Sequence, residues 1–232
     1  MILEVDGLSR KLNGRYVLDN ISIKLEKGSI MGLLGPNGSG KTTLMKIIAG
    51  IQRPTSGSLK IDGERPGVST KKIVSYLPDE NHLYDWLRVK DTIKFFADFF
   101  EDFNKEKAVS LLKEMGIDFN KKLNQLSKGM LQVVRVCLVV SRKAKLYILD
   151  EPFNGIDIVA REKIQNIIQN SYNEESSVLI TTHIFNEIER FMDHVVFISK
   201  GKKILEGECD SIRQEKAKSL EEIYKEIFAN ED

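Results

Sequence analysis

The chain of 232 residues contains no apolar run that approaches the roughly 20 residues needed to cross a lipid bilayer as a helix. Its first residues, MILEVDGL, lack the basic and then apolar segments of a secretion signal. Only two cysteines are present, Cys137 and Cys209, and their spacing matches no metal-binding motif. Cys137 stands in the apolar stretch VRVCLVV, where we expect it to pack in the core. These absences predict a protein of the reducing cytosol.

An excess of either charge is also missing. The chain has 35 Lys and Arg residues and 34 Asp and Glu residues, which gives a net charge of +1. This balance does not indicate a nucleic-acid-binding protein, and no nucleic-acid partner is expected. With 41% hydrophobic and 30% charged residues, the composition is typical of a folded soluble protein and argues against disorder.

Short β-like runs alternate with helical ones along much of the chain. Several of these runs are almost continuously apolar, as strands covered on both faces should be. We therefore expect a parallel sheet flanked by helices. The amino-terminal runs are more polar and predict an antiparallel sheet beside the core. The runs of the main sheet are Ile30–Leu34, Val74–Leu77, Leu146–Leu149, Val178–Thr181 and Val195–Ile198, and those of the amino-terminal sheet are Leu3–Val5, Ile21–Leu25 and Leu59–Ile61.

Helical periodicity replaces the β pattern between about Asp79 and Lys143, over Lys90–Phe103, Lys105–Met115 and Met130–Arg142. We expect a single domain over residues 1–215, with a core of 1–78 and 144–215 and an inserted helical subdomain at about 79–143. Residues 216–232 are expected to form an amphipathic helix. Ser219 and Glu222 have the spacing of a capping box at its start, and the helix is interpreted as a brace on the core.

The segment GPNGSGKTT follows the apolar run IMGLL and precedes the helical TTLMKIIAG. The pattern G-x-x-x-x-G-K-[ST] between a strand and a helix is typical of a loop whose N–H groups bind phosphate. The helix that follows directs its positive end to the same place. Lys41 is expected to reach the β- and γ-phosphates, and Thr42 to offer its hydroxyl to Mg²⁺. The predicted nucleotide-binding residues of the loop are Gly35, Pro36, Asn37, Gly38, Ser39, Gly40, Lys41, Thr42 and Thr43.

A second apolar run ends in two acidic residues, in LYILDEP. Asp150 at the carboxyl end of this strand is placed to hold Mg²⁺, and Glu151 to polarise the attacking water as a general base. Such strand ends form the usual ligand crevice of an open α/β sheet. Alone, an Asp-Glu pair would indicate the start of a solvated helix, but the phosphate loop upstream favours the functional interpretation.

A third run, VLITT, ends at His183, whose imidazole is a candidate to hydrogen-bond the γ-phosphate. The other two histidines, His82 and His194, are interpreted as structural or solvated.

These residues, together with LSKGM at Leu126–Met130, resemble the ATP-binding cassette (ABC) family over nearly the whole chain. LSKGM stands where that family has its LSGGQ-like signature, and PFNGID at Pro152–Asp157 is similar to its D-loop. The resemblance implies an α/β P-loop NTPase core with an amino-terminal antiparallel subdomain and an inserted helical subdomain. It also implies ATP and Mg²⁺ as cofactors and ATP hydrolysis as the activity.

The resemblance further implies two cassettes, identical or different, that sandwich two ATP molecules head to tail. Each ATP would touch Lys41 of one subunit and the region of Ser127 and Gly129 of the other, with Asp157 of the D-loop nearby. An integral-membrane permease subunit is the implied partner, so the chain is expected at the inner face of the cell membrane.

Three positions depart from the family pattern. Asp79 in YLPDE stands where the family has glutamine, and its carboxylate either approaches Mg²⁺ or turns to solvent. Lys128 and Met130 replace glycine and glutamine of the signature, and Lys128 is expected to face solvent. Tyr16 is the candidate to stack on adenine.

Five of the eleven phenylalanines fall between Phe95 and Phe103. Phe95, Phe99 and Phe103 form one helical stripe, and Ile93, Phe96 and Phe100 form its neighbour. One stripe is expected in the core. The other, with Tyr84 and Trp86, is a candidate groove for a cytoplasmic helix of the membrane subunit.

The variants LSKGM and YLPDE resemble those of bacterial ABC-2-type exporters of peptides, drugs or ions. The alternatives are an ABC ATPase that acts on nucleic acid or ribosomes, and a regulator that binds ATP without cleaving it. The chain has one cassette and no sustained heptads, which argues against the first alternative. The presence of both Glu151 and His183 argues against the second.

Overall fold

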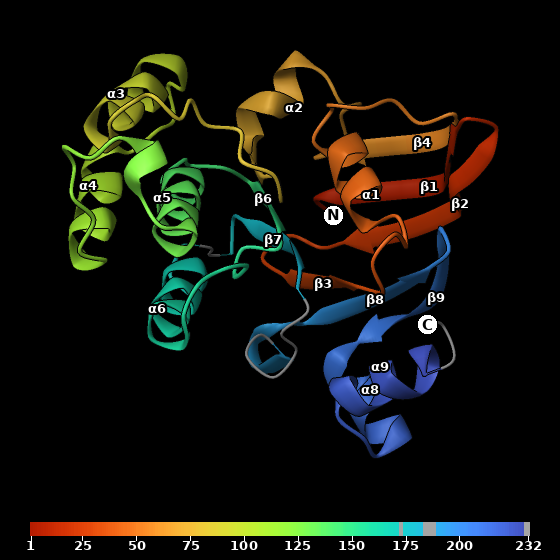
Figure 1. Ribbon diagram of the computed structural model, residues 1–232. Coiled ribbons are helices and arrows are strands. Elements are labelled where there is room, and N and C mark those ends of the chain that lie inside the picture. Colours follow the sequence, from red (N-terminus) through yellow and green to blue (C-terminus); the bar gives the residue numbers. More distant parts are fainter. Residues whose placement is uncertain (172–173, 183–188, 230–232) are drawn as a thin grey trace.

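The computed structural model describes residues 1–171, 174–182 and 189–229. Within these ranges the strands form two sheets (Figure 1). The smaller is antiparallel in the order β2-β1-β4 and pairs Leu3 with both Leu25 and Ile61. Its strands are β1 (Leu3–Leu12), β2 (Arg15–Leu25) and β4 (Ser56–Ile61), which confirms the predicted amino-terminal antiparallel sheet.

The larger sheet has the order β5-β6-β7-β3-β8-β9. All of its neighbouring pairs are parallel except β8 and β9, which are antiparallel. The predicted parallel sheet is confirmed, with an antiparallel edge strand added. The strands are β3 (Ile30–Leu34), β5 (Val74–Leu77), β6 (Leu146–Asp150), β7 (Ser177–Thr181), β8 (His194–Ser199) and β9 (Lys202–Glu208).

Helices connect and cover the strands. Figure 1 shows α1 beside the antiparallel sheet, whereas α3, α4 and α5 lie together on the opposite side of the molecule. The division into a core and a helical subdomain at residues 79 and 143 stays a prediction. The helices up to β7 are α1 (Lys41–Ile48), α2 (Val68–Ile73), α3 (Val89–Phe99), α4 (Lys105–Glu114), η1 (Leu123–Gln125), α5 (Lys128–Val140) and α6 (Ile158–Gln169).

Helix α3 ends four residues earlier than the predicted Phe103. The chain becomes extended at Phe100, with φ −112° and ψ 114°. The turn that follows brings the Phe103 ring to 5.7 Å from the ring of Phe96, which is buried in the core. Burial of Phe103 therefore competes with continuation of the helix, and the predicted grouping of Phe103 with Phe95 and Phe99 is wrong.

The carboxy-terminal part of the described chain contains η2 (Glu189–Phe191), α8 (Cys209–Lys216) and α9 (Leu220–Phe228). The predicted capping box is present, because Ser219 Oγ accepts from Glu222 N and the Glu222 carboxylate accepts from Ser219 N. The rings of Tyr224 and Phe228 lie 5.9 and 6.0 Å from that of Phe197 in β8. Helix α9 thus packs on the main sheet, as the interpretation as a brace expects.

Both cysteines are buried as free thiols, and burial raises the pKa of each to about 12. Cys137 therefore has the core position predicted for it. Across the ranges that the structure describes, no helix has the length and apolarity to cross a membrane.

Candidate functional site

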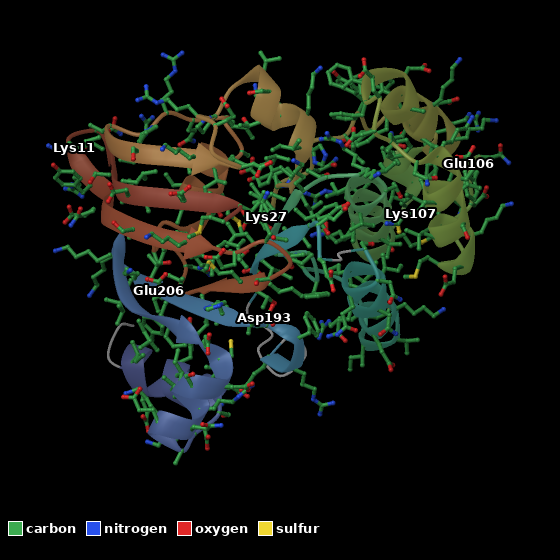
Figure 2. All side chains as sticks on the ribbon, turned by 180° about the vertical axis from the view of Figure 1, so that it is seen from behind. Lys11, Lys27, Glu106, Lys107, Asp193 and Glu206 are labelled. Atoms are coloured by element: carbon green, nitrogen blue, oxygen red, sulfur yellow. The ribbon has the colours of Figure 1, made fainter. Side chains whose placement is uncertain are left out.

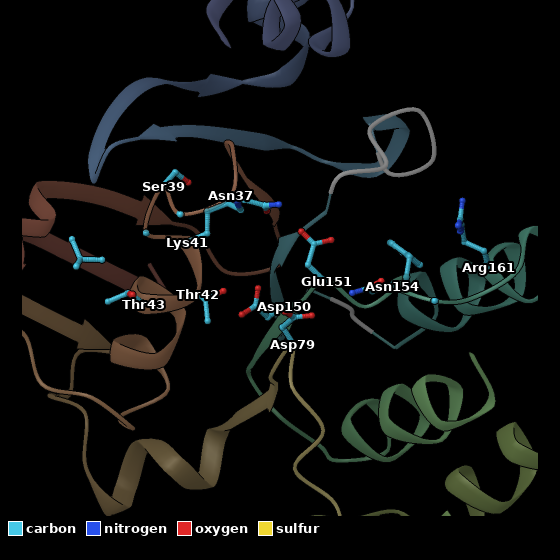
Figure 3. A pocket seen from close by; sticks show the side chains of 15 residues that line it. Asn37, Ser39, Lys41, Thr42, Thr43, Asp79, Asp150, Glu151, Asn154 and Arg161 are labelled. Atoms are coloured by element: carbon cyan, nitrogen blue, oxygen red, sulfur yellow. The ribbon is translucent and has the colours of Figure 1, made fainter. Parts of the chain in front are cut away.

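A cavity of about 530 Å³ opens at the carboxyl ends of β3, β5 and β6 (Figure 3). Parallel strands end at the same edge of their sheet, so the loops that follow them meet there. The cavity is lined by Val17, Asn37, Gly38, Ser39, Gly40, Lys41, Thr42, Thr43, Asp79, Asp150, Glu151, Phe153, Asn154, Gly155 and Arg161. It therefore collects most of the loop residues, both acids of LYILDEP and Asp79 of YLPDE.

Glycine is required at two positions of the phosphate loop by both backbone conformation and space. Gly35 has φ 155°, and a Cβ there would lie 2.0 Å from Ile198 O. Gly40 has φ 107°, and a Cβ there would lie 2.7 Å from Val17 O and from a methyl of Leu18. Only glycine fits such close contacts in this conformation. The loop therefore turns tightly between β3 and α1, and the N-terminus of α1 faces the cavity.

Lys41 is the first residue of α1 and is only 7% exposed. Its Nζ donates to Gly35 O at 2.7 Å and to Pro36 O at 3.0 Å. Burial lowers the pKa of the Lys41 ammonium, while the carboxylates of Glu151 and Asp150 act to raise it. The loop thus holds a buried cation within the electrostatic reach of two acids.

Asp150 ends β6 and is 1% exposed. Its Oδ1 accepts a hydrogen bond of 2.8 Å from Thr181 Oγ1 of the neighbouring strand β7. Its Oδ2 is buried and has no hydrogen-bond partner among the described residues. Burial raises the pKa of Asp150, and the nearby hydroxyls of Thr181 and Thr42 lower it in part.

This arrangement fits a magnesium ion. Mg²⁺ prefers hard oxygen ligands and is usually held by one or two carboxylates together with substrate phosphates and water. Asp150 Oδ2 is an orphaned buried carboxylate oxygen, and the Thr42 hydroxyl lies within hydrogen-bond reach of the same carboxylate. The described residues contain no group of three His, Cys, Asp or Glu arranged to hold a metal by themselves. A metal held by Asp150 here would take its further ligands from phosphate and water.

Glu151 has a left-handed backbone, with φ 51°. This conformation is uncommon for a residue other than glycine and costs on the order of 1–3 kcal/mol. Its N–H donates to Thr181 Oγ1 at 2.9 Å, so the hydroxyl that holds Asp150 also fixes the backbone of Glu151. The Glu151 side chain lines the cavity, near Asp150 (Figure 3).

Asp79 follows β5 and lines the cavity beside Asp150 (Figure 3). It is solvent-exposed, but its carboxylate contributes to the raised pKa of Asp150. Asp79 both lines the cavity and is exposed to solvent, so its role toward Mg²⁺ stays a prediction.

Six of the predicted residues that the structure describes lie outside the lining of the cavity, so their roles stay predictions; two of them, Gly35 and Pro36, accept hydrogen bonds from Lys41. Ser127 is the N-cap of α5 and accepts from Met130 N at 3.2 Å, and Gly129 follows in the first turn. Asp157 is the N-cap of α6 and accepts from Ala160 N at 2.9 Å. Tyr16 is 51% exposed and contacts Lys11, whose Nζ lies 4.3 Å from the ring centroid.

His183 lies outside the residues that the structure describes, and its predicted role is not tested. Strand β7 ends at Thr181, so the predicted strand before the histidine is present. Neither His82 nor His194 lines the cavity as described.

The cavity also contains residues that the sequence analysis did not single out. Asn154 and Gly155 belong to PFNGID, so the resemblance to the D-loop was the signal that could have found them. Val17 on β2 and Arg161 on α6 carry no such signal. Both line the cavity only because β2 and α6, which are far apart in the sequence, come together at this place in the folded chain.

Comparisons with known proteins agree with this geometry. The family model described as ABC transporter matches residues 18–154, which is more than half of the chain. The lantibiotic transport ATP-binding protein SrtF of Streptococcus pyogenes is 31% identical over 96% of each chain. The aliphatic sulfonates import ATP-binding protein SsuB of Bacillus cereus is 30% identical over 98% of this chain and 95% of that one.

A solved structure described as the ATP-binding subunit of an ABC transporter is similar with a TM-score of 0.87. It is 27% identical and the match covers 97% of this chain and 99% of that one. The cavity, the phosphate loop and these similarities agree with one another. The chain belongs to the ABC transporter family and is an ATPase subunit of such a transporter.

Proposed function

We propose that this cavity binds ATP with Mg²⁺ and that hydrolysis there powers transport across a membrane. The observation that carries the proposal is the convergence of Lys41, the orphaned oxygen of Asp150 and Glu151 on one cavity. A phosphate-binding loop, a metal-binding acid and a base are the parts that phosphoryl transfer to water requires.

In this mechanism the loop Gly35–Thr43 and the N-terminus of α1 bind the phosphates, and Lys41 neutralises part of their charge. Asp150, Thr42 and Asp79 would hold Mg²⁺, which spreads the charge of the phosphates. Glu151 orients a water molecule in line with the γ-phosphate and accepts its proton. The hydrogen bonds of Thr181 to Asp150 and Glu151 keep the two acids in fixed relative positions.

The substitution Glu151→Gln tests this proposal, because glutamine keeps the size of the side chain but cannot accept the proton. We expect ATP turnover to fall by about 10²–10⁴-fold while ATP affinity stays near that of the parent. Glu106→Gln is the matched control, since Glu106 is an exposed acid on α4 (Figure 2) and does not line the cavity. Turnover of Glu151→Gln at the parental rate would rule out Glu151 as the base.

The working unit is proposed to be a head-to-tail pair of cassettes, of this chain with itself or with a second ATPase subunit. The support is the position of Ser127, which is exposed at the N-terminus of α5 and lies outside the cavity of its own chain. A helix N-terminus without an anion of its own can bind a phosphate presented by another subunit.

A membrane permease subunit is proposed to dock on an exposed aromatic patch of four residues, Tyr84, Trp86, Phe95 and Phe99. Their exposed fractions are 50, 65, 42 and 68%, and their rings form a continuous chain of contacts at 4.9–5.9 Å. The neighbouring Phe96 is buried, as one of the two predicted stripes was expected to be. An exposed apolar patch of this kind typically marks a partner site.

The substitution Phe99→Asp should weaken copurification of the chain with its membrane subunit. It should leave the ATPase activity of the isolated chain unchanged, because Phe99 does not line the cavity. Copurification equal to that of the parent would contradict the assignment of this patch.

Export is the proposed direction of transport. It rests on the LSKGM and YLPDE variants and on the similarity to the lantibiotic transporter subunit, whereas the sulfonate import subunit is similar to nearly the same extent. We also propose that the chain lies at the inner face of the cell membrane, beside its permease subunit. Uptake measured in membrane vesicles that hold the whole transporter tests the direction: ATP supplied to the face that carries the cassettes should drive substrate away from that face.

A further inference from the structure

Two buried polar side chains stand in an otherwise apolar stretch of α5. Gln132 is 4% exposed and Arg135 is 5% exposed, and they are surrounded in sequence by buried valines, Cys137 and Leu138. A buried cation and a buried amide lower the stability of a fold unless their hydrogen bonds are satisfied. Their partners therefore indicate why the helix contains them.

Gln132 holds the segment that carries Glu151. Its Nε2 donates to Glu151 O at 3.2 Å and to Pro152 O at 3.1 Å. Its Oε1 accepts a hydrogen bond from Arg135 Nη1. Each polar atom of the amide is therefore used.

Arg135 holds the loop that carries Asp79. Its Nη2 donates to the carbonyls of three successive residues, Pro78, Asp79 (3.1 Å) and Glu80 (2.6 Å). Strands β5 and β6 are hydrogen-bonded neighbours, but their ladder ends at Leu77 and Leu149. Beyond those residues the Gln132–Arg135 pair joins the two loops.

We propose that Gln132 and Arg135 are positioning residues, which hold the backbone of the Asp79 loop and of the Glu151 segment at a fixed distance across the phosphate cavity. This inference rests on the proposed function of Glu151 and deepens it. Neither side chain lines the cavity, so each acts through the carbonyls that it binds. A displacement of about 1 Å at a catalytic group can reduce the rate about 100-fold, so loss of either side chain should reduce turnover.

Arg142 provides a matched control on the same stretch of chain. It is 6% exposed and donates to the carbonyls of Val74 (2.8 Å), Lys71 (3.3 Å) and Lys72 (3.2 Å). It also pairs with Asp102 at 3.1 Å. Its environment is like that of Arg135, but none of its partners lines the phosphate cavity.

The experiment compares Arg135→Met, Gln132→Met and Arg142→Met in the full chain. Turnover, affinity for a fluorescent ATP analogue, melting temperature and amide hydrogen exchange are measured at a temperature where every variant is folded. For Arg135→Met and Gln132→Met we expect kcat to fall about tenfold or more, with nucleotide affinity within about threefold of the parent. Exchange should become faster at the amides of residues 79–81 in the first variant and of residues 151, 153 and 154 in the second. Arg142→Met should lower the melting temperature and retain kcat.

A parental kcat in folded Arg135→Met and Gln132→Met, or an equal loss of kcat in Arg142→Met, would overturn the inference. If the methionine variants do not fold, Gln132→Glu provides the test. It keeps the acceptor for Arg135 but cannot donate to the carbonyls of Glu151 and Pro152, so kcat should fall and parental kcat would refute the role. Glu151→Gln separates the two hypotheses: if it retains turnover, the proposed base and this inference both fail. If it loses turnover while Arg135→Met and Gln132→Met do not, only this inference fails.

Discussion

Replacement of Asp150 by asparagine should make the nucleotide-free chain more stable and inactive at the same time. The Asp150 side chain is 1% exposed, and its Oδ2 lacks a partner within the described part of the chain. A buried carboxylate with an unpartnered oxygen does not stabilise the fold, so we interpret Asp150 as a ligand-binding residue. Asparagine keeps an oxygen that can accept from Thr181 Oγ1 and removes the buried charge.

The size of the effect follows from the buried charge, because asparagine places an amide nitrogen where Oδ2 lies and that nitrogen has no partner either. A buried polar atom without a partner costs about 1–3 kcal/mol and a charged one costs more, so we take about 1–3 kcal/mol as the gain on removing the charge. For a chain of this length, 1 kcal/mol changes the melting temperature by roughly 2–4 °C. We therefore expect the melting temperature of Asp150→Asn to rise by roughly 2–12 °C near pH 8.

The gain should depend on pH, because burial raises the pKa of Asp150 above its ordinary value of 3.8. Below that value the carboxyl is protonated in both the folded and the unfolded chain, and the variant gains nothing. As the pH rises through the raised pKa, the unfolded chain has already released the proton and the folded chain must hold a buried charge. The parent therefore loses stability relative to the variant over this range, and the difference is constant above it.

Differential scanning calorimetry without nucleotide or Mg²⁺, from pH 4.5 to 8, measures this difference. Asp79→Asn is the control, because Asp79 lines the same cavity but is exposed, so its melting temperature should change little. A lower melting temperature for Asp150→Asn at pH 8, or a difference that is the same at every pH, would refute the argument.

Three further substitutions test other parts of the structure. Lys41→Ala should abolish ATPase activity and weaken ATP binding, because it removes the fixed positive charge of the loop; near-parental turnover would contradict the assignment of this site. In Glu151→Gln, saturating ATP should give a dimer in size-exclusion chromatography with light scattering, and added Ser127→Arg should give a monomer that still binds ATP. A dimer that survives Ser127→Arg is incompatible with the head-to-tail pair. Ser219→Ala removes the capping bond at α9 and should lower the melting temperature by roughly 2–4 °C, for a loss of about 1 kcal/mol; an unchanged melting temperature would argue against the brace.

The sequence predicted the buried strands well because their signal is local. Ile30–Leu34 and Val74–Leu77 have the predicted bounds, since both are mostly apolar and are followed by the turn-forming residues Gly35 and Pro78. Strand β9, KKILEGE, was not predicted, because it is an edge strand whose residues are mostly exposed and its pairing with β8 depends on the rest of the sheet. The end of α3 at Phe99 was missed for a similar reason, since burial of Phe103 against Phe96 is a tertiary contact.

For the site, spacing along the chain was sufficient to predict that Lys41, Asp150 and Glu151 lie together, because each stands at or after the carboxyl end of a strand of the same sheet. Their hydrogen-bond partners could not be predicted. Thr181 belongs to β7, and its position beside Asp150 depends on the strand order. Arg135 is unremarkable in sequence, and its contacts depend on the path of the loop after β5.

The strand order has a consequence for how the protein is made. Strand β7 lies between β6, which carries the acids, and β3, which precedes the phosphate loop. The two halves of the cavity therefore have no direct pairing and come together only after Thr181 has been synthesised, 138 residues after Thr43. At about 5–20 residues per second, a ribosome needs roughly 7–28 s for that interval. Until β7 is present, Asp150 and Glu151 are not held beside the phosphate loop. A nascent chain therefore cannot hydrolyse ATP until most of its length has been translated.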